Sequence, residues 1–339
     1  MISRTTIAIA ATMLGAAAAN AQSVNYTKLV DDAKGYKKTM LYLDLFTADT
    51  YLEPSIGSAV KLETVVAGRI MPWAQVKFAW TDAASHHAVT GYPTVKGGQK
   101  KQMSVDLGGA LYLVNKTKSG KPVKVVLSSH KSGKVTTTKY INVPAQVSKM
   151  FGPEGGINFM RKAVGLGDDA SKYYRYESMD GSVNLPIESV GGSGKQPAGL
   201  AYDPQSMTNV MSVFAGIHFR KVTNLSIKTD GYGVKSSRKA GDFYVDAMIA
   251  PTVPIAHVID AAGQEWKMVK QDGAVRNLGW RMGYTHHNSY KVGFAYNFEV
   301  GQRPGPKLGD GFMDNGTYIV LGMGLSIGSK FGLGKKDKG

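Results

Sequence analysis

The sequence predicts an all-β fold, an antiparallel transmembrane β-barrel of about 12 strands with a long irregular loop region. Three observations lead to this prediction. Many segments alternate strictly between apolar and other residues, these segments are long for a soluble sheet, and their second face mixes small residues with charged ones.

The alternation is clearest in YKVGFAYNFEVG, residues 290–301. Successive side chains of a strand point to opposite faces, so Phe294 and Phe298 share one face while Ala295 and Glu299 share the other. Such an amphipathic strand could turn its apolar face toward a protein core or toward lipid.

Segment length and composition favour lipid. The alternating segments run about 9 to 13 residues, whereas a tilted strand needs ~9–11 residues to cross a bilayer and soluble strands usually have ~5–6. Their second face holds Gly, Ala and Ser beside Asp, Glu, Lys and Arg, as the interior of a barrel does. A soluble secreted β-sandwich is the alternative fold.

Thirteen segments fit this pattern, but single-chain bacterial barrels have an even number of strands. Short turns normally face the periplasm and long loops the outside. Sides assigned in this way from the first strands and from the last strands are consistent only if one segment between 121 and 229 does not span the membrane. The hairpin 121–143 is rich in Lys and Thr and suits lipid poorly, as do 171–179 and 222–229, so we expect twelve strands. The candidate segments are 38–47, 58–70, 73–82 (after a Met71-Pro72 turn), 102–114, 121–129, 134–143, 171–179, 209–220, 222–229, 240–250, 277–286, 289–300 and 316–329.

The last of these segments resembles a known class. YIVLGMGLSIGSKF, from Tyr318 to Phe331, resembles the amphipathic, aromatic-ending terminal strand of the outer-membrane β-barrels of Gram-negative bacteria, although GLGKKDKG follows it. The resemblance implies an outer-membrane location, outer-membrane lipid as surroundings and the barrel assembly machinery as a partner. It implies no activity.

The chain ends complete the expected organisation. Residues 1–21 have a basic start, an apolar run and Ala19-Asn20-Ala21, which is typical of a secretory signal peptide. Residues 22–36 form an N-terminal segment, 37–331 the barrel and 332–339 a basic tail. The absence of cysteine excludes disulfides and thiolate metal sites.

Residues 144–208 do not follow the alternation of apolar and other residues. They include GINFMRKAVG, with Ile157, Met160 and Val164 at helical spacing, and the aromatic YYRY at 173–176. A loop of this length is usually functional or disordered. It could enter the lumen as a constriction or stand outside as a binding excursion.

Eleven charged residues have the parity of the inward face and form the candidate site. Six are basic and five acidic, so they could line a small channel or pair into a plug. The net charge of +16 fits either a basic lumen or attraction to anionic head groups. The eleven are Asp44, Lys61, Glu63, Arg69, Lys77, Asp106, Arg220, Asp246, Arg281, Lys291 and Glu299.

No catalytic, cofactor or metal residue is assigned. The pairs His86-His87 and His286-His287 are weak ligand sets because neighbours on a strand point apart. In a hydrolase, His218 would be the base that activates Ser212 or Ser226. Hydrogen bonding inside the barrel is the preferred role for His218. No nucleic-acid recognition motif is visible.

The leading functional hypothesis is a passive small-solute channel, or a barrel whose external loops bind other envelope proteins. The alternative is a non-conducting structural or accessory subunit of an envelope complex with a plugged lumen. An outer-membrane lipid-modifying enzyme is a third hypothesis, and we expect no enzymatic activity.

Overall fold

The computed structural model describes residues 24–36, 38–52, 55–82, 102–165, 172–185, 187–190, 194–197, 205–255, 257–259, 265–288, 292–312 and 315–329. The expected signal peptide at 1–21 and the tail at 332–339 lie outside these residues. Among the described residues, no helix has the length and apolar character needed to cross a membrane.

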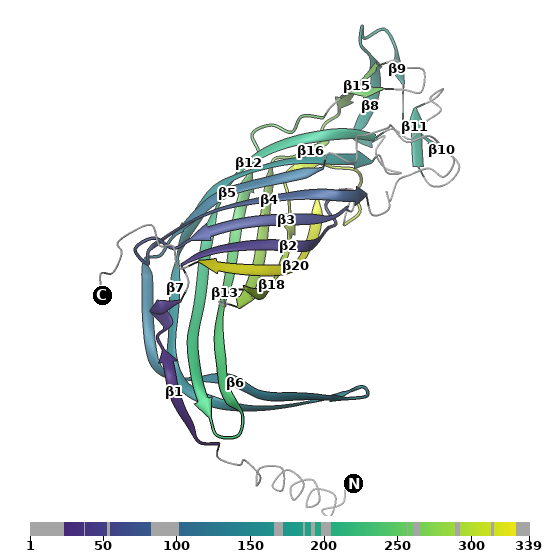
Figure 1. Ribbon diagram of the computed structural model, residues 1–339. Coiled ribbons are helices and arrows are strands. Elements are labelled where there is room, and N and C mark those ends of the chain that lie inside the picture. The colour runs from purple at the N-terminus through teal and green to yellow at the C-terminus, as the bar shows by residue number, and fades with distance from the viewer. Residues whose placement is uncertain are drawn as a thin grey trace, which may run out of the picture.

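Ten antiparallel strands close into a barrel (Figure 1). Around the ring they run β12-β13-β17-β18-β20-β2-β3-β4-β5-β7, and β7 pairs with β12 to close it. Two further strands of the same twelve-stranded sheet, β1 and β6, lie outside the ring. The expected antiparallel barrel is confirmed, with ten of the twelve sheet strands in its wall.

Most barrel strands begin and end within a few residues of the expected segments. Segments 209–220 and 222–229 form one continuous strand, and 134–143 belongs to the longest strand. The wall strands are β2 (Thr39–Asp49), β3 (Ser55–Thr64), β4 (Ile70–Asp82), β5 (Met103–Leu111), β7 (Val135–Gly165), β12 (Gln205–Thr229), β13 (Gly233–Ile249), β17 (Leu278–Asn288), β18 (Val292–Gln302) and β20 (Thr317–Ser329).

The two ends of the barrel differ. One end, here called the turn end, carries short connections such as 65–69 and 230–232, together with the start of β2 and the end of β20. The opposite end, here called the loop end, carries the long connections 83–102, 166–204, 250–277 and 303–316. Short turns at one end and long loops at the other are the pattern of outer-membrane barrels.

The apolar faces of the strands form the outside of the barrel. On β18, Val292, Phe294 and Phe298 are exposed, whereas Ala295 and Glu299 are buried. Neighbouring strands repeat this arrangement, so the outer wall is an apolar surface like the lipid-facing band of transmembrane barrels. The apolar face of β18 is therefore the side that faces lipid.

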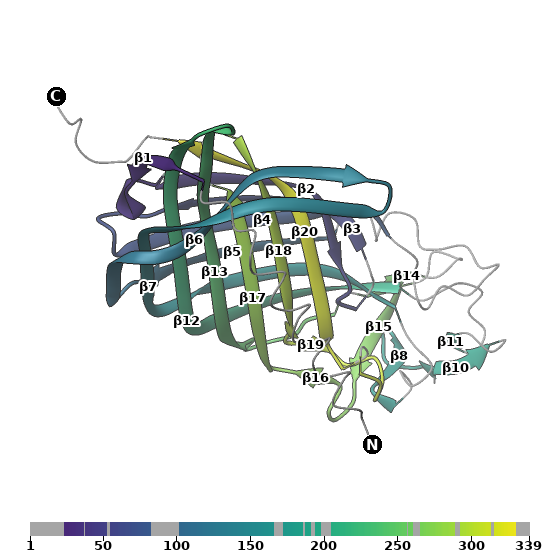
Figure 2. The same ribbon diagram turned by 90° about the horizontal axis from the view of Figure 1, so that it is seen from below.

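A sheet extends beyond the turn end. β6 (Val114–Ser132) and the first half of β7 form a long hairpin, and the ends of β12 and β13 also project past the wall. β1 (Tyr26–Asp31) pairs with the end of β12. The hairpin folds over the outward face of β12 and β13, as seen in Figure 2, where Val125 and Val143 pack with Leu225 and Ile227. This extension has a small apolar core of its own.

Small β-sheets lie at the loop end. The largest sheet there joins β14 (Val258–Ile259), β15 (Glu265–Lys270), β8 (Tyr174–Ser178) and β9 (Asn184–Leu185). Two-stranded sheets join β10 (Ile187–Val190) to β11 (Gly194–Pro197) and β16 (Val275–Arg276) to β19 (Gly305–Pro306). A single 3-10 turn, η1 (Ala33–Gly35), links β1 to β2. Segment 171–179 thus belongs to the loop end, outside the wall.

Two local predictions were wrong. The expected loop starting at residue 144 begins only after Gly165, because residues 144–165 continue β7, and the helical spacing in GINFMRKAVG is overridden by pairing on both sides. The turn expected at Met71-Pro72 lies at 65–69 instead, where Ala67 and Gly68 adopt positive φ values of 50° and 68°. Pro72 lies within β4.

Candidate functional site in the barrel lumen

Arg281 of β17 organises a buried ionic cluster in the middle of the lumen, here called the central cluster. Its Nε donates to Asp246 on the neighbouring strand β13 (2.7 Å), and its Nη1 donates to Asp106 on β5 (3.0 Å). Because β17 and β5 are not neighbours in the ring, these side chains meet across the interior. The guanidinium also lies 4.1 Å from the centre of the Phe214 ring. The cluster therefore ties opposite walls together.

A second cluster, the turn-side cluster, surrounds Arg220 of β12. Its Nη1 lies 2.8 Å from Glu63 of β3 and 3.4 Å from Asp242 of β13. Tyr42 donates its hydroxyl hydrogen to Glu63 (2.7 Å) and lies 2.9 Å from Nδ1 of His287. All five side chains are buried, so this network also bridges strands across the lumen.

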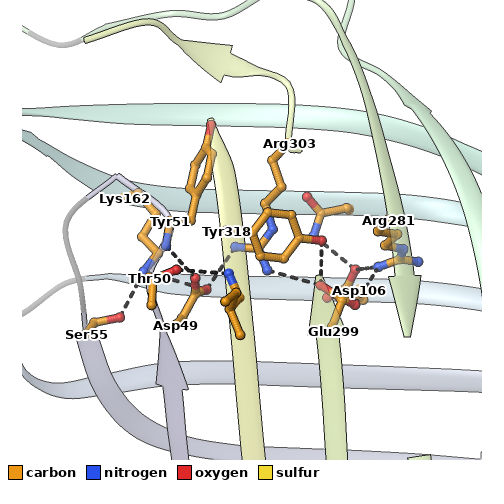
Figure 3. Close-up of polar contacts among 12 residues, drawn as sticks. Asp49, Thr50, Tyr51, Ser55, Asp106, Lys162, Arg281, Glu299, Arg303 and Tyr318 are labelled. Carbon is orange, nitrogen blue, oxygen red and sulfur yellow. Dashed lines mark hydrogen bonds and ion pairs between the residues drawn. The ribbon is translucent and has the colours of Figure 1, made fainter. Parts of the chain in front are cut away.

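A third cluster, the loop-side cluster, surrounds Arg303, which follows β18 (Figure 3). Its guanidinium lies 2.8 Å from Asp49 and 3.3 Å from Glu299, and stacks 3.8 Å from the centre of the Tyr318 ring. Tyr318 donates to Glu299 (2.7 Å), and Lys162 of β7 lies 3.7 Å from Asp49. Glu299 also lies 3.8 Å from Arg281, which links this cluster to the central one.

Two small chambers lie beside these clusters. A chamber bordered by Tyr42, Trp73, Lys77 and Arg281 leaves ≈ 40 Å³ for water-sized molecules, and a second one bordered by Lys162 leaves ≈ 30 Å³. A single water needs about 10–15 Å³ on this measure. Each chamber therefore holds a few waters.

Among the described residues, one group has the composition of a metal site: Glu63, Asp242 and His287, whose ligand atoms lie within 4.8 Å of one another. Arg220 already approaches both carboxylates. Because its positive charge takes the place that a cation would occupy, the arrangement favours an ion-pair network over a metal centre.

The serine and histidine side chains considered for hydrolysis do not meet. His218 lies near Asp242 (3.7 Å) and Tyr112 (3.3 Å). Ser212 donates instead to Asn158 (3.5 Å), and Ser226 accepts from Ser236 (3.0 Å). His218 therefore acts in the lumen network as a buried hydrogen-bonding group.

The structure places most of the eleven candidate charges in these networks. Lys61 and Lys77 are half-buried beside the first chamber. Arg69 does not face the lumen, because β3 ends at Thr64 and Arg69 lies exposed in the following turn. Lys291 lies outside the described residues. The buried ones are Asp44, Glu63, Asp106, Arg220, Asp246, Arg281 and Glu299.

Sequence reasoning missed several members of the clusters. Asp242 shares the parity of Asp246 on the same strand, so alternation alone could have found it. Asp49 has the wrong parity because a register shift near Leu45 exchanges the two faces of β2. Lys162 lies in the segment taken for a loop. Arg303 follows the last residue of β18 and has no alternation to mark it.

Taken together, an apolar outer wall and a charged, side-chain-filled interior define a transmembrane β-barrel of the antiparallel class. No protein-family model matches the sequence, and no curated protein is significantly similar to it.

Comparison with solved structures matches this chain to OprB of Pseudomonas putida, in its high-pH form, and to the outer-membrane protein OmpT of Vibrio cholerae, folded in vitro. The OprB match has 8% identity and a TM-score of 0.17, and it covers 81% of this chain and 59% of the OprB chain. The OmpT match has 9% identity and a TM-score of 0.18, and it covers 88% of this chain and 99% of the OmpT chain.

Proposed function

We propose that this chain is an outer-membrane barrel that does not conduct solutes and serves as a structural or accessory subunit of an envelope complex. The observation that carries this proposal is the set of ion pairs that cross the lumen at three levels. Of the two functions that the sequence leaves open, the geometry favours the plugged barrel over the small-solute channel.

Barrel size supports the plugged lumen. About eight strands enclose a space just wide enough for side chains to fill, whereas porins of 16–18 strands leave an aqueous channel. Ten strands lie near the filled end of this range. Large side chains such as Trp73, Phe214, Tyr244 and Arg281 occupy the lumen at its middle.

The burial and pairing of the charged side chains also support a plugged lumen. The side chains of Arg220 and Glu63 are completely shielded from solvent, and those of Arg281 and Asp106 are 5% and 3% exposed. In a conducting pore, wall charges face water and remain separately solvated. Here Arg220 and Arg281 are each neutralised by carboxylates of other strands, so an ion at these two levels would meet neither solvation nor a free binding charge.

The outer membrane is the compartment that suits this fold. Closed barrels are one of only two structures that satisfy every backbone group in lipid. Short turns usually face the periplasm and long loops the outside, so we place the turn end and its extension in the periplasm. As an accessory subunit, the protein would then contact the rest of the envelope complex through the extension and through the small sheets of the loop end.

The test is the conductance of the refolded mature chain in a planar bilayer under a salt gradient. We expect no discrete current steps from protein whose folding is verified by a heat-dependent shift on a detergent gel. A sixteen-stranded porin inserted by the same procedure serves as the positive control.

Discrete steps from the folded wild-type chain would contradict the plugged lumen and restore the channel hypothesis. The sign of the reversal potential would then show whether basic or acidic groups govern passage.

A further inference from the structure

The outward face of three wall strands forms a groove at the turn end, outside the lumen and outside the clusters described above. In the sheet, Gly241 of β13 lies directly between Lys221 of β12 and His286 of β17. Because Gly241 has no side chain, the Tyr284 hydroxyl can lie close above it, 2.9 Å from the place a Cβ atom would take. The groove measures ≈ 460 Å³ and is lined by Phe219, Lys221, Thr223, Lys239, Gly241, Phe243, Tyr284 and His286.

One side of the groove is aromatic and the other is basic. Phe243 and Tyr284 are paired across β13 and β17 on the side of the apolar wall. Lys221 and Lys239 lie on the side of the extension. Apolar surface followed by aromatic rings and then by cations is the order of groups from the acyl chains of a bilayer to its head groups.

The cations of the groove are not neutralised within the protein. Across the part of the chain that the structure describes, the ammonium groups of Lys221 and Lys239 form no ion pair. Lys239 pairs with Thr223, two residues from Lys221 on the same face of the sheet, so the two lysines rise side by side from the outward face. Two like charges side by side in one groove, neither with an ion-pair partner among the described residues, are an arrangement that suits an anion.

The hairpin that begins beside this groove is basic throughout. Residues 114–151 contain no Asp, Glu or Arg. The lysines are all exposed, and they are Lys116, Lys118, Lys121, Lys124, Lys131, Lys134, Lys139 and Lys149. The hairpin folds over the outward face of the barrel strands (Figure 2), so this charge lies outside the lumen, beside the wall.

We propose that the groove around Gly241 binds the phosphate head group of an anionic phospholipid from the leaflet at the turn end. Lys221 and Lys239 supply the positive charge for the phosphate. His286 and the hydroxyl of Tyr284 lie at its other side as hydrogen-bonding groups, and Phe219 and Phe243 contact the start of the acyl chains. The basic β6–β7 hairpin adds a long-range attraction to the same leaflet. This site is independent of whether the lumen conducts.

The test compares binding of phosphatidylglycerol and phosphatidylcholine with identical short acyl chains. The full mature chain is purified in a neutral detergent and titrated with each lipid, and bound lipid is counted by native mass spectrometry. We expect roughly tenfold or greater preference for phosphatidylglycerol, since each lysine near an anionic surface contributes a several-fold gain in affinity.

Two variants test the site itself. Lys221→Gln combined with Lys239→Gln should remove the preference. Gly241→Leu should reduce lipid binding without changing any charge, because a Cβ atom at this position already lies 2.9 Å from the Tyr284 hydroxyl and a longer side chain fills the groove. That hydroxyl is the mobile end of a side chain, so the strand itself tolerates the change.

The matched control removes two charges from the same two strands outside the groove, by Lys228→Gln with Lys235→Gln. It should keep at least half of the affinity for phosphatidylglycerol. Equal binding of the two lipids by the wild-type chain would overturn the proposal. So would an equal loss in the control and in the groove variant, since that would reduce the effect to net charge. Displacement of the lipid by inorganic phosphate, with no difference between the two lipids, would assign the groove to free phosphate instead.

Discussion

Arg281→Ala is expected to destabilise the barrel by about 3–5 kcal/mol, the range found when one partner of a buried ion pair is removed. The substitution leaves Asp106 and Asp246 in the lumen without the guanidinium that both contact. The carboxylate of Glu299, 3.8 Å away, also loses a nearby positive charge. Unfolding in urea, followed by the heat-dependent gel shift in lipid vesicles, measures the effect.

The matched control is Arg69→Ala, which removes the same side chain from the exposed turn before β4. Its effect should stay within about 0.5 kcal/mol, as for most surface substitutions. Should Arg281→Ala prevent folding altogether, adding Asp106→Asn and Asp246→Asn tests the reason. These changes remove the unpaired charges, so they should restore part of the folded fraction. An Arg281→Ala barrel as stable as Arg69→Ala would show that the central cluster does not hold the walls together.

The second large effect is expected on the outside of the wall. Leu321→Arg places a charge near the middle of β20, where the leucine is 47% exposed on the outer face. In a bilayer this should cost about 2–4 kcal/mol, the range for Arg or Lys at the midplane of a barrel. The measurement is the folded fraction in phospholipid vesicles as a function of urea concentration.

Val126→Arg is the comparison, because Val126 is also 47% exposed but lies on β6 in the extension. There the new charge faces water or head groups, and we expect almost no loss of stability. Equal losses for the two variants would contradict the assignment of the outer wall to lipid and of the hairpin to the outside of the membrane.

Much of the wall could be predicted from the sequence because alternation is a local signal. Segments such as 289–300 and 316–329 show it without interruption, and each corresponds to one strand. Composition marks 121–143, 171–179 and 222–229 alike as unsuited to lipid, but only β6 and β8 lie outside the ring, whereas 135–143 and 222–229 belong to the wall strands β7 and β12. What alternation cannot show is whether a strand continues beyond the bilayer, as β7 and β12 do.

The lumen clusters could be predicted less completely, for two physical reasons. One bulge in β2 reverses the parity beyond Leu45, so Asp49 enters the lumen although its number assigns it to the outside. The pairing of charges also depends on which strands face each other across the ring. Arg220 and Glu63 are far apart in the chain, and only the closed register brings them to 2.8 Å.

The order of the strands around the ring affects how the chain folds. Most pairings join strands that follow one another closely in the sequence, but β2 pairs with β20, so Thr39 lies beside Ser329. β1 likewise finds its partner only at the end of β12. Contacts between such distant segments are slow to form, because the loop they close must lose its conformational freedom first. The ring therefore cannot close until its last strand is present, and an incomplete chain keeps two unpaired edges, one of them β2.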